Sequence, residues 1–464
     1  MAGALPAAWR RAGLAIALAA AAGAAACGSP GEMPRRGAGA SGTGESGADG
    51  AGPGLTADSV RQPIRLGVDV LFRDSAELLA GLRVGLITNH TGLSWPRSAD
   101  GSERVDRSDP PARPPLSMDD AVSTIDRLAA HPAWELVALF SPEHGIRGDV
   151  DRPVDSSVDE RTGLPIHSLY GDTRKPTPAM LDGLDALVFD IQDIGTRYYS
   201  YVWTMALAME AAAEQGLRFV VLDRPNPIDG EHVQGNVKPS YMPVAYYEAA
   251  MRHGLTAGEL ARYVDGEYGL GADLRVVPME GWTREMWWED TGIPWRPPSP
   301  NMPSVESATH YPGTCLFEGT NLSVGRGTPE AFRQWGAPWL DAETLVGELR
   351  ERGFPGVTFD AVTFTPDGPT DGKYGGEPVR GIRQTVTDRS VYDPVPVAIA
   401  ALLEITQLHP AELRWREGWF DGLAGGPRIR ELIQSGATLR QITAPWPEQQ
   451  QAFETVRNPY LLYD

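Results

Sequence analysis

Four short apolar runs, each followed at once by polar residues, alternate with segments of helical spacing in the first half of the chain. The runs have the length of strands and are rich in Leu, Ile, Val and Phe, which is typical of strands buried on both faces. They are Leu82–Thr88, Trp134–Phe140, Leu184–Phe189 and Leu217–Leu222. The alternation predicts an α/β fold with a Rossmann-like, doubly wound, mostly parallel sheet and a site along the carboxyl edge of its strands.

A carboxylate, an imidazole and a guanidinium follow the second run within five residues. Ser141-Pro142 ends the strand, because proline donates no hydrogen bond to the ladder and restricts the residue before it. Glu143, His144 and Arg147 come next. Burial beside a strand end raises the pKa of a carboxyl group toward neutrality, which suits a general acid. Glu143 is therefore the first candidate for catalysis; capping the next helix or pairing with an arginine is the alternative use.

The other strand ends supply the remaining candidates. Asp190, Asp193 and Asp223 compete for the second catalytic role as base, nucleophile or charge stabiliser, with the first two preferred. For any single one of them, the favoured interpretation is a structural one, as a helix cap or as the partner of Arg197 or Arg224. The candidates for substrate binding are Asn89, His90, His144, Arg147, Gln192, Arg197, Tyr199, Asp223, Arg224, Asn226 and Arg326.

Composition and missing motifs exclude several classes of function. The chain carries 61 acidic against 41 basic residues, a net charge of −20, and it has no basic stripe, which argues against a nucleic-acid partner. No Gly-x-Gly-x-x-Gly follows the first run and no phosphate-binding loop motif is present, so no nucleotide cofactor is expected. His-Glu-x-x-His is also absent, so no metal site is expected, although His90, Glu143 and the aspartates could converge.

The N-terminus has the pattern of an export signal. Arg10 and Arg11 precede an apolar run too short to span a bilayer, and residues 1–27 end at Cys27 in a sequence that resembles a lipoprotein processing site. Lipidation of Cys27 is the expectation, with a simple secreted protein as the alternative. Residues 28–60 are rich in Gly, Ala, Ser and Pro and predict a flexible tether. The protein is therefore expected outside the cytoplasm, as a membrane-anchored lipoprotein or otherwise secreted.

The folded part is predicted to contain two domains. Residues 61–290 would form the Rossmann-like catalytic domain and residues 291–464 a smaller α+β domain that completes the cleft, with Pro297–Pro303 as a boundary or crossing segment. The predicted helices are Asp119–Ala130, Tyr201–Gln215, Ala342–Arg352 and Pro394–Leu408.

Four longer motifs carry a resemblance to a known family. They are Phe140–Gly148, Asp190–Tyr199, Asp223–Pro227 and Gly313–Asn321. With these motifs in order, the chain from Leu82 onward is similar to the exo-β-N-acetylmuramidases of the NamZ type. The resemblance implies a Rossmann-like domain joined to a smaller C-terminal domain with the active cleft between them. It also implies release of terminal N-acetylmuramic acid from the non-reducing end of peptide-free peptidoglycan glycans, with the family's catalytic glutamate falling on Glu143.

Muramic acid carries a lactyl carboxylate, which a guanidinium can hold through two parallel hydrogen bonds. Arg147, Arg197 and Arg326 are the candidates for this role. We expect one of the aspartates to lie within about 10 Å of Glu143, and the spacing of the two carboxyl groups would separate a retaining from an inverting mechanism.

Two other functions stay open. The first is a non-catalytic, lipid-anchored protein that binds cell-wall glycans. The second is an esterase or amidase, which the absence of a Gly-x-Ser-x-Gly elbow disfavours. In each case contact with a membrane is expected only through the lipid anchor.

Overall fold

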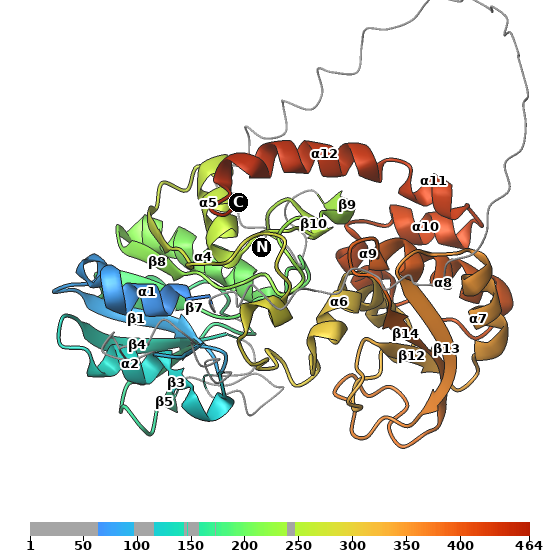
Figure 1. The fold of residues 1–464 in the computed structure, drawn as a ribbon, viewed down its shortest axis with the longest axis horizontal. Helices are drawn as coiled ribbons and strands as arrows, with labels where there is room; N and C mark the ends of the chain where they lie inside the picture. Colours follow the sequence, from blue (N-terminus) through green and yellow to red (C-terminus); the bar gives the residue numbers. More distant parts are fainter. Residues whose placement is uncertain (1–63, 97–115, 143–145, 147–156, 172, 239–245) are drawn as a thin grey trace, which may run out of the picture. The chain divides into compact units, whose positions relative to one another are not determined.

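The computed structural model describes residues 64–96, 116–142, 146, 157–171, 173–238 and 246–464 (Figure 1). All of them belong to one compact unit, Pro63–Asp464. The signal sequence, Cys27 and the tether lie outside the described residues, so the predictions for them stay predictions. Among the helices that are described, none is long and apolar enough to cross a membrane.

One sheet organises the N-terminal half. Its order is β11-β8-β7-β1-β4-β6-β5, and every neighbouring pair is parallel except β5 with β6. The strands are β1 (Arg83–Thr88), β4 (Glu135–Ser141), β5 (Ser157–Val158), β6 (Pro165–Ser168), β7 (Ala186–Asp190), β8 (Arg218–Leu222) and β11 (Asp273–Val277). The antiparallel edge strand β5 can be left aside and the six parallel strands numbered 1 to 6 along the chain. Their order across the sheet, from β6 to β11, is then 3-2-1-4-5-6, which is the order of a Rossmann fold. The predicted fold class is confirmed.

Helices cover both faces of this sheet, and the two-residue period of a strand explains how. Within β1, Leu86 packs in a core shared with α1 and α2, whereas its neighbour Ile87 packs in a core shared with α4 and α5. The helices are α1 (Gly67–Asp74), α2 (Thr124–Ala130), α3 (Pro178–Leu181), α4 (Ser200–Gln215) and α5 (Ala257–Tyr268). Because both faces are buried, the strands are continuous apolar runs rather than alternating ones.

Two of the predicted helices in this half have different outcomes. The helix predicted at Tyr201–Gln215 is confirmed as α4, which ends at Gly216 in the left-handed conformation, with φ 69°. The helix predicted at Asp119–Ala130 is wrong in its first half. A 3₁₀ turn and the short strand β3 (Val122–Ser123) precede α2, because Ser123 caps that helix by accepting a hydrogen bond from the N–H of Ile125.

The C-terminal half contains a three-stranded antiparallel sheet, ordered β12-β14-β13, packed with helices around a third core. The strands are β12 (Gln334–Ala337), β13 (Val357–Phe364) and β14 (Val379–Val386), and the helices are α6 (Val305–Thr314), α7 (Ala342–Glu351), α8 (Pro394–Leu408), α9 (Glu417–Ala424), α10 (Arg428–Gln434), α11 (Leu439–Thr443) and α12 (Trp446–Arg457). The helices predicted at Ala342–Arg352 and Pro394–Leu408 are confirmed as α7 and α8.

Short elements join these parts. They are η4 (Ala76–Leu78), β2 (Leu93–Ser94), η5 (Met118–Asp120), β9 (Gln234–Lys238), β10 (Ala249–Arg252), η6 (Trp288–Thr291), η7 (Cys315–Gly319) and η8 (Asn458–Tyr460).

The last residues of the chain return to the N-terminal half. Phe453 of α12 belongs to the core beneath α4 and α5, and α12 lies beside β9 (Figure 1). Arg262 of α5 donates to the carbonyl oxygens of Tyr460 and Leu461, at 2.9 Å each. The C-terminal segment therefore helps to hold the Rossmann-like sheet together.

Candidate active site

The carboxyl ends of β1 and β7 meet where the strand order reverses, the place at which folds of this type bind their ligands. Thr88, the last residue of β1, pairs with Asp190, the last residue of β7. Asn89 and His90 follow β1 directly, and Gln192 follows β7. The structure thus brings the predicted residues of these two strands to one edge of the sheet.

Asp190 is fully buried in an ion pair. Arg224 donates to both of its carboxylate oxygens, from Nε at 2.6 Å and from Nη2 at 2.9 Å, and Thr124 Oγ1 donates at 2.6 Å. Arg224 also donates to the carbonyl oxygen of Leu93. Asp190 accepts hydrogen bonds from three donor atoms of the protein and is closed to solvent, so it has little capacity left for a substrate. The geometry therefore favours a structural role for Asp190 and Arg224.

Asp223 is also buried and saturated with donors. It accepts hydrogen bonds from Thr256 Oγ1, the N–H of Gly258 and the hydroxyl of Tyr463, besides the N–H of Arg224. Burial raises the pKa of Asp223 to about 6, against the lowering effect of these hydrogen bonds. Asp223 therefore ties the C-terminal end of the chain to the end of β8.

Asn226 fixes the turn that follows β8 and packs against Gly195, in the turn that follows β7. Its amide donates to the carbonyl oxygen of Leu255 and accepts from the N–H of Ile228. A Cβ atom on Gly195 would lie 2.3 Å from Asn226 Oδ1, and Gly195 has φ 78°. Only glycine fits this close approach.

Three polar atoms at the reversal point have no hydrogen-bond partner within the described residues: Asn89 Nδ2, Gln192 Oε1 and Asp193 Oδ1. Thr91 connects two of these residues, since its hydroxyl donates to Asn89 Oδ1 at 2.6 Å and accepts from the N–H of Gln192 at 3.0 Å. Buried polar atoms are nearly always hydrogen-bonded. These three atoms are therefore positions where a bound ligand or water can form hydrogen bonds.

Asp193 accepts fewer hydrogen bonds within the described residues than Asp190 or Asp223 does. Its Oδ2 accepts from the N–H of Gly195 at 2.7 Å and lies 4.0 Å from His253 Nε2. Burial raises the pKa of Asp193 to about 7 and lowers the pKa of His253 to about 3. The imidazole is thus uncharged near neutral pH, and the two side chains do not form an ion pair there. A carboxyl group that titrates near neutrality keeps Asp193 in consideration for proton transfer.

Arg197 is occupied by the fold. It is buried and donates from Nη1 and Nη2 to the carbonyl oxygens of Asn236, Ala249 and Leu423 and to Asn236 Oδ1, at 2.8–3.2 Å. Burial lowers its pKa to about 10. Both terminal nitrogens are engaged, so the geometry disfavours Arg197 as the group that binds a substrate carboxylate.

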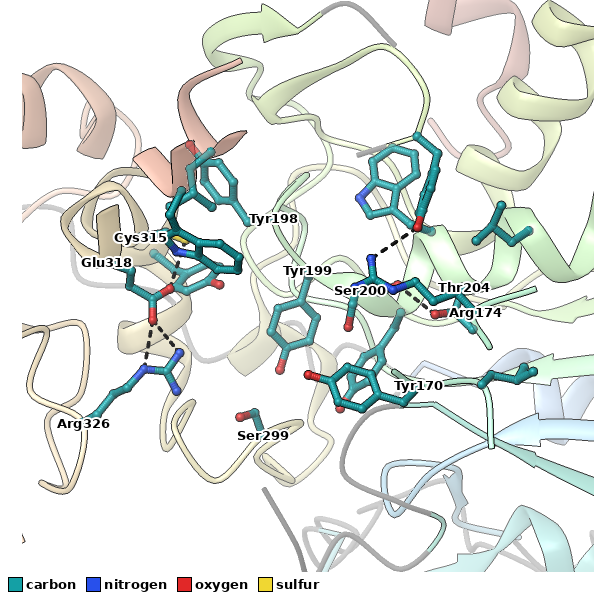
Figure 2. A pocket seen from close by; sticks show the side chains of 18 residues that line it. Tyr170, Arg174, Tyr198, Tyr199, Ser200, Thr204, Ser299, Cys315, Glu318 and Arg326 are labelled. Carbon is teal, nitrogen blue, oxygen red and sulfur yellow. Dashed lines mark hydrogen bonds and ion pairs between the residues drawn. The ribbon is translucent and has the colours of Figure 1, made fainter. Parts of the chain in front are cut away.

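A cavity of about 240 Å³ lies beside this edge, between residues that follow β6, the start of α4 and residues of the C-terminal half. Figure 2 shows the hydroxyl groups of Tyr170 and Tyr199 pointing toward one another, with Ser299 close by. Trp419, whose surface is 47% exposed, also lines the cavity. Aromatic rings and hydroxyl groups around a small space are the usual lining of a sugar-binding site.

Two arginines line this cavity. Arg326 donates from Nε at 2.9 Å and from Nη2 at 2.6 Å to the same oxygen of Glu318 (Figure 2). The guanidinium lies within 3.4 Å of Thr370 Oγ1 through its third nitrogen. Arg174, which is exposed, donates to the hydroxyl of Tyr246 at 3.3 Å. Of the predicted arginines that the structure describes, Arg326 is the one that faces the cavity.

The proline-rich segment predicted as a boundary or crossing connects the strand ends to the cavity. His90 Nε2 lies 2.7 Å from the carbonyl oxygen of Pro297. The hydroxyl of Tyr201 donates to the carbonyl oxygen of Pro298. Ser299 lines the cavity and Asn301 donates to Thr370 Oγ1. His90 is thus placed to hold this wall of the cavity in position.

Glu143, His144 and Arg147 lie outside the described residues, and their assignments remain predictions. Ser141 is the last residue of β4, which pairs with β1 on one side and β6 on the other. Glu143 follows two residues later in the sequence. Its distance to Asp190 and Asp193, which would indicate the stereochemical outcome, is not defined by the described residues.

The cavity also contains residues that the sequence did not single out. Tyr170, Arg174, Glu318 and Trp419 are in its lining but not among the predicted site residues. Glu318 lies within the motif Gly313–Asn321, so the motif located the site, but its spacing did not indicate which side chain faces the cavity. In the described parts of the chain, no three His, Cys, Asp or Glu side chains are grouped as metal ligands would be.

Comparison with known proteins gives a consistent result. The family description "Exo-beta-N-acetylmuramidase NamZ, N-terminal" matches residues 84–306, and the corresponding C-terminal description matches residues 309–463. The peptidoglycan β-N-acetylmuramidase NamZ of Bacillus subtilis is 41% identical over 419 residues, which cover 89% of this chain and 95% of that protein.

Two crystal structures of DUF1343 family proteins from Bacteroides fragilis have the same fold. One has a TM-score of 0.75 at 36% identity and the other 0.64 at 28%; each match covers 87% of this chain and 99% of the other.

The fold and the sequence relationship define a glycoside hydrolase with a Rossmann-like domain and a smaller C-terminal domain. The chain belongs to the exo-β-N-acetylmuramidase NamZ family.

Proposed function

We propose that this protein hydrolyses peptide-free peptidoglycan fragments and releases N-acetylmuramic acid from their non-reducing ends. The observation that carries the proposal is the small cavity with Tyr170, Tyr199, Glu318 and Arg326 in its wall. A volume of about 240 Å³ is smaller than the about 300–1,000 Å³ that is usual for pockets enclosing drug-sized ligands. The cavity therefore suits one sugar unit better than an extended glycan.

Glu143 is proposed as the general acid. It follows β4, whose neighbours β1 and β6 deliver Asn89 and Tyr170 to the same edge. Hydrolysis needs a proton on the leaving oxygen when the glycosidic bond breaks, and a carboxyl group partly removed from water can supply it. Asp193 is the preferred second carboxyl group, because Asp190 and Asp223 are consumed by buried hydrogen bonds.

Arg326 is proposed to bind the lactyl carboxylate that distinguishes muramic acid from glucosamine. It lines the cavity, and its Nη1 has only a 3.4 Å contact to Thr370 Oγ1. The competing candidate Arg197 has its terminal nitrogens on backbone carbonyls, and Arg174 is exposed. A charge-assisted bond is stronger where water is excluded, which favours Arg326.

A chromogenic β-N-acetylmuramide and the matching β-N-acetylglucosaminide test this function. We expect release of the chromophore from the muramide and a much lower rate with the glucosaminide. Glu143→Gln should lose turnover of an unactivated muramic acid–glucosamine disaccharide, whose leaving oxygen needs a proton. The alternative, a wall-binding protein without catalysis, predicts binding of the muramide with no release by the wild type. That result would refute the proposed hydrolysis.

A further inference from the structure

Glu318 is the single carboxylate among the described residues that line the cavity. Its side chain is 14% exposed and that of its partner Arg326 is 19% exposed. Both nitrogens that Arg326 donates to Glu318 go to Oε1. The guanidinium carries only donors, so Glu318 is the acceptor in this pair.

The second oxygen of Glu318 retains capacity for a ligand. Oε2 has a long contact of 3.5 Å to the thiol of Cys315, which is a weak donor. Burial raises the pKa of Cys315, so the thiol stays protonated and does not repel the carboxylate. An ionised carboxylate has about four acceptor positions, and the contacts just described use three of them. The remaining one suits a hydroxyl group of a bound sugar.

The chemistry of the substrate restricts which hydroxyl this can be. In an N-acetylmuramic acid unit linked through C1, C2 carries the acetamido group and C3 the lactyl ether, so free hydroxyl groups can stand only on C4 and C6. In every unit except the non-reducing terminal one, the oxygen on C4 is part of a glycosidic bond. A site that requires the C4 hydroxyl therefore accepts terminal units and rejects internal ones.

Resting on the proposed function, we propose that Glu318 accepts a hydrogen bond from the C4 hydroxyl of the terminal muramic acid and thereby makes the enzyme exo-acting. C3 and C4 are neighbours on the ring, as Arg326 and Glu318 are neighbours in the wall. The ion pair then recognises two adjacent substituents of the sugar: Arg326 binds the lactyl carboxylate on C3, and Glu318 binds the hydroxyl on C4.

The test combines substrate analogues with a substitution. Chromogenic β-N-acetylmuramides with a hydroxyl at both C4 and C6, without the C4 hydroxyl, and without the C6 hydroxyl are compared in the wild type and in Glu318→Gln. Loss of a hydrogen bond to a charged group corresponds to a decrease in kcat/KM of about 10- to 150-fold. The wild type should lose about this factor in kcat/KM on the 4-deoxy substrate and little on the 6-deoxy substrate. Glu318→Gln should lose it on the parent substrate and show no further loss on the 4-deoxy one.

Glu306→Gln is the matched control, because Glu306 also forms an ion pair, with Arg333 at 3.0 Å, but does not line the cavity. It should keep the wild-type ratio between the parent and 4-deoxy substrates. If the wild type turns the 4-deoxy substrate over as fast as the parent, the proposal is refuted even if Glu318→Gln does not fold. A folded Glu318→Gln that keeps the wild-type ratio, or a ratio that depends on the C6 hydroxyl instead, also overturns it. Absence of turnover of the parent muramide by the wild type would refute the proposed function itself.

Discussion

Two groups of polar residues differ in how many hydrogen bonds they have left for a ligand. The strand-end network, made of Asp190, Arg224 and Asp223, is buried, and the carboxylates are saturated with donors from the protein. The cavity wall, made of Tyr170, Tyr199, Glu318 and Arg326, is partly exposed and faces an open volume. The strand-end network holds the edge of the sheet together, whereas the cavity wall is the part that we propose recognises the substrate.

The largest effect is expected from Glu143→Gln. Removal of a positioned proton donor costs about 10²- to 10⁴-fold in rate, and the exchange of a carboxyl group for an amide of equal size is expected to leave the melting temperature nearly unchanged. Steady-state kinetics on an unactivated muramic acid–glucosamine disaccharide measures this. A variant that keeps more than about a tenth of the wild-type turnover would remove Glu143 from the mechanism.

A substitution in the strand-end network should lower the stability of the protein rather than act on the catalytic step. Asp190→Ala leaves Arg224 buried without its partner, and breaking a buried ion pair costs about 3–5 kcal/mol of stability. Urea unfolding followed by circular dichroism measures the loss, with Glu306→Gln as the control at a partly exposed ion pair. If Asp190→Ala is as stable as the wild type but inactive, the network takes part in catalysis and the distinction drawn between the two groups fails.

Arg326→Ala should act on selectivity. Loss of a charge-assisted bond to the lactyl carboxylate, worth about 1.5–3 kcal/mol, lowers kcat/KM on the muramide more than on the glucosaminide. Arg174→Ala, which removes the exposed arginine of the same cavity, serves as the comparison and should leave the preference nearly intact. Equal preference in Arg326→Ala and the wild type would show that the carboxylate is bound by another group.

The last prediction concerns the pH dependence of stability at Asp193, an effect that is spread over several pH units. Its pKa is raised from 3.8 to about 7 in the folded protein, so between these two pH values the folded state binds more protons than the unfolded state. Stability should therefore fall as the pH rises through this range, by at most about 1.4 kcal/mol per pH unit for one proton. Asp193→Asn should lack this contribution. Parallel slopes for the two proteins between pH 4 and pH 7 would contradict the raised pKa.

The sequence predicted the sheet because its strands are buried on both faces and must be apolar throughout. It also predicted that Asn89, Asp190 and Gln192 lie at one edge, since parallel strands end on the same side. It left open which polar side chains are consumed by the fold. Asp190 and Arg224 meet across a separation of 34 residues, and the donor from Tyr463 reaches Asp223 across 240. Such long-range pairs follow from packing and have no local signal, which is also why Glu318 was not singled out.

A crystal structure of Glu143→Gln with a bound disaccharide that carries N-acetylmuramic acid at its non-reducing end tests the central claim most directly. We expect the muramic acid ring in the cavity, its lactyl carboxylate on Arg326 and its C4 hydroxyl on Glu318, with the strand-end network unchanged. A sugar bound outside the cavity, or one whose carboxylate contacts Arg224 or Arg197 instead, would contradict the assignment of recognition to the cavity wall.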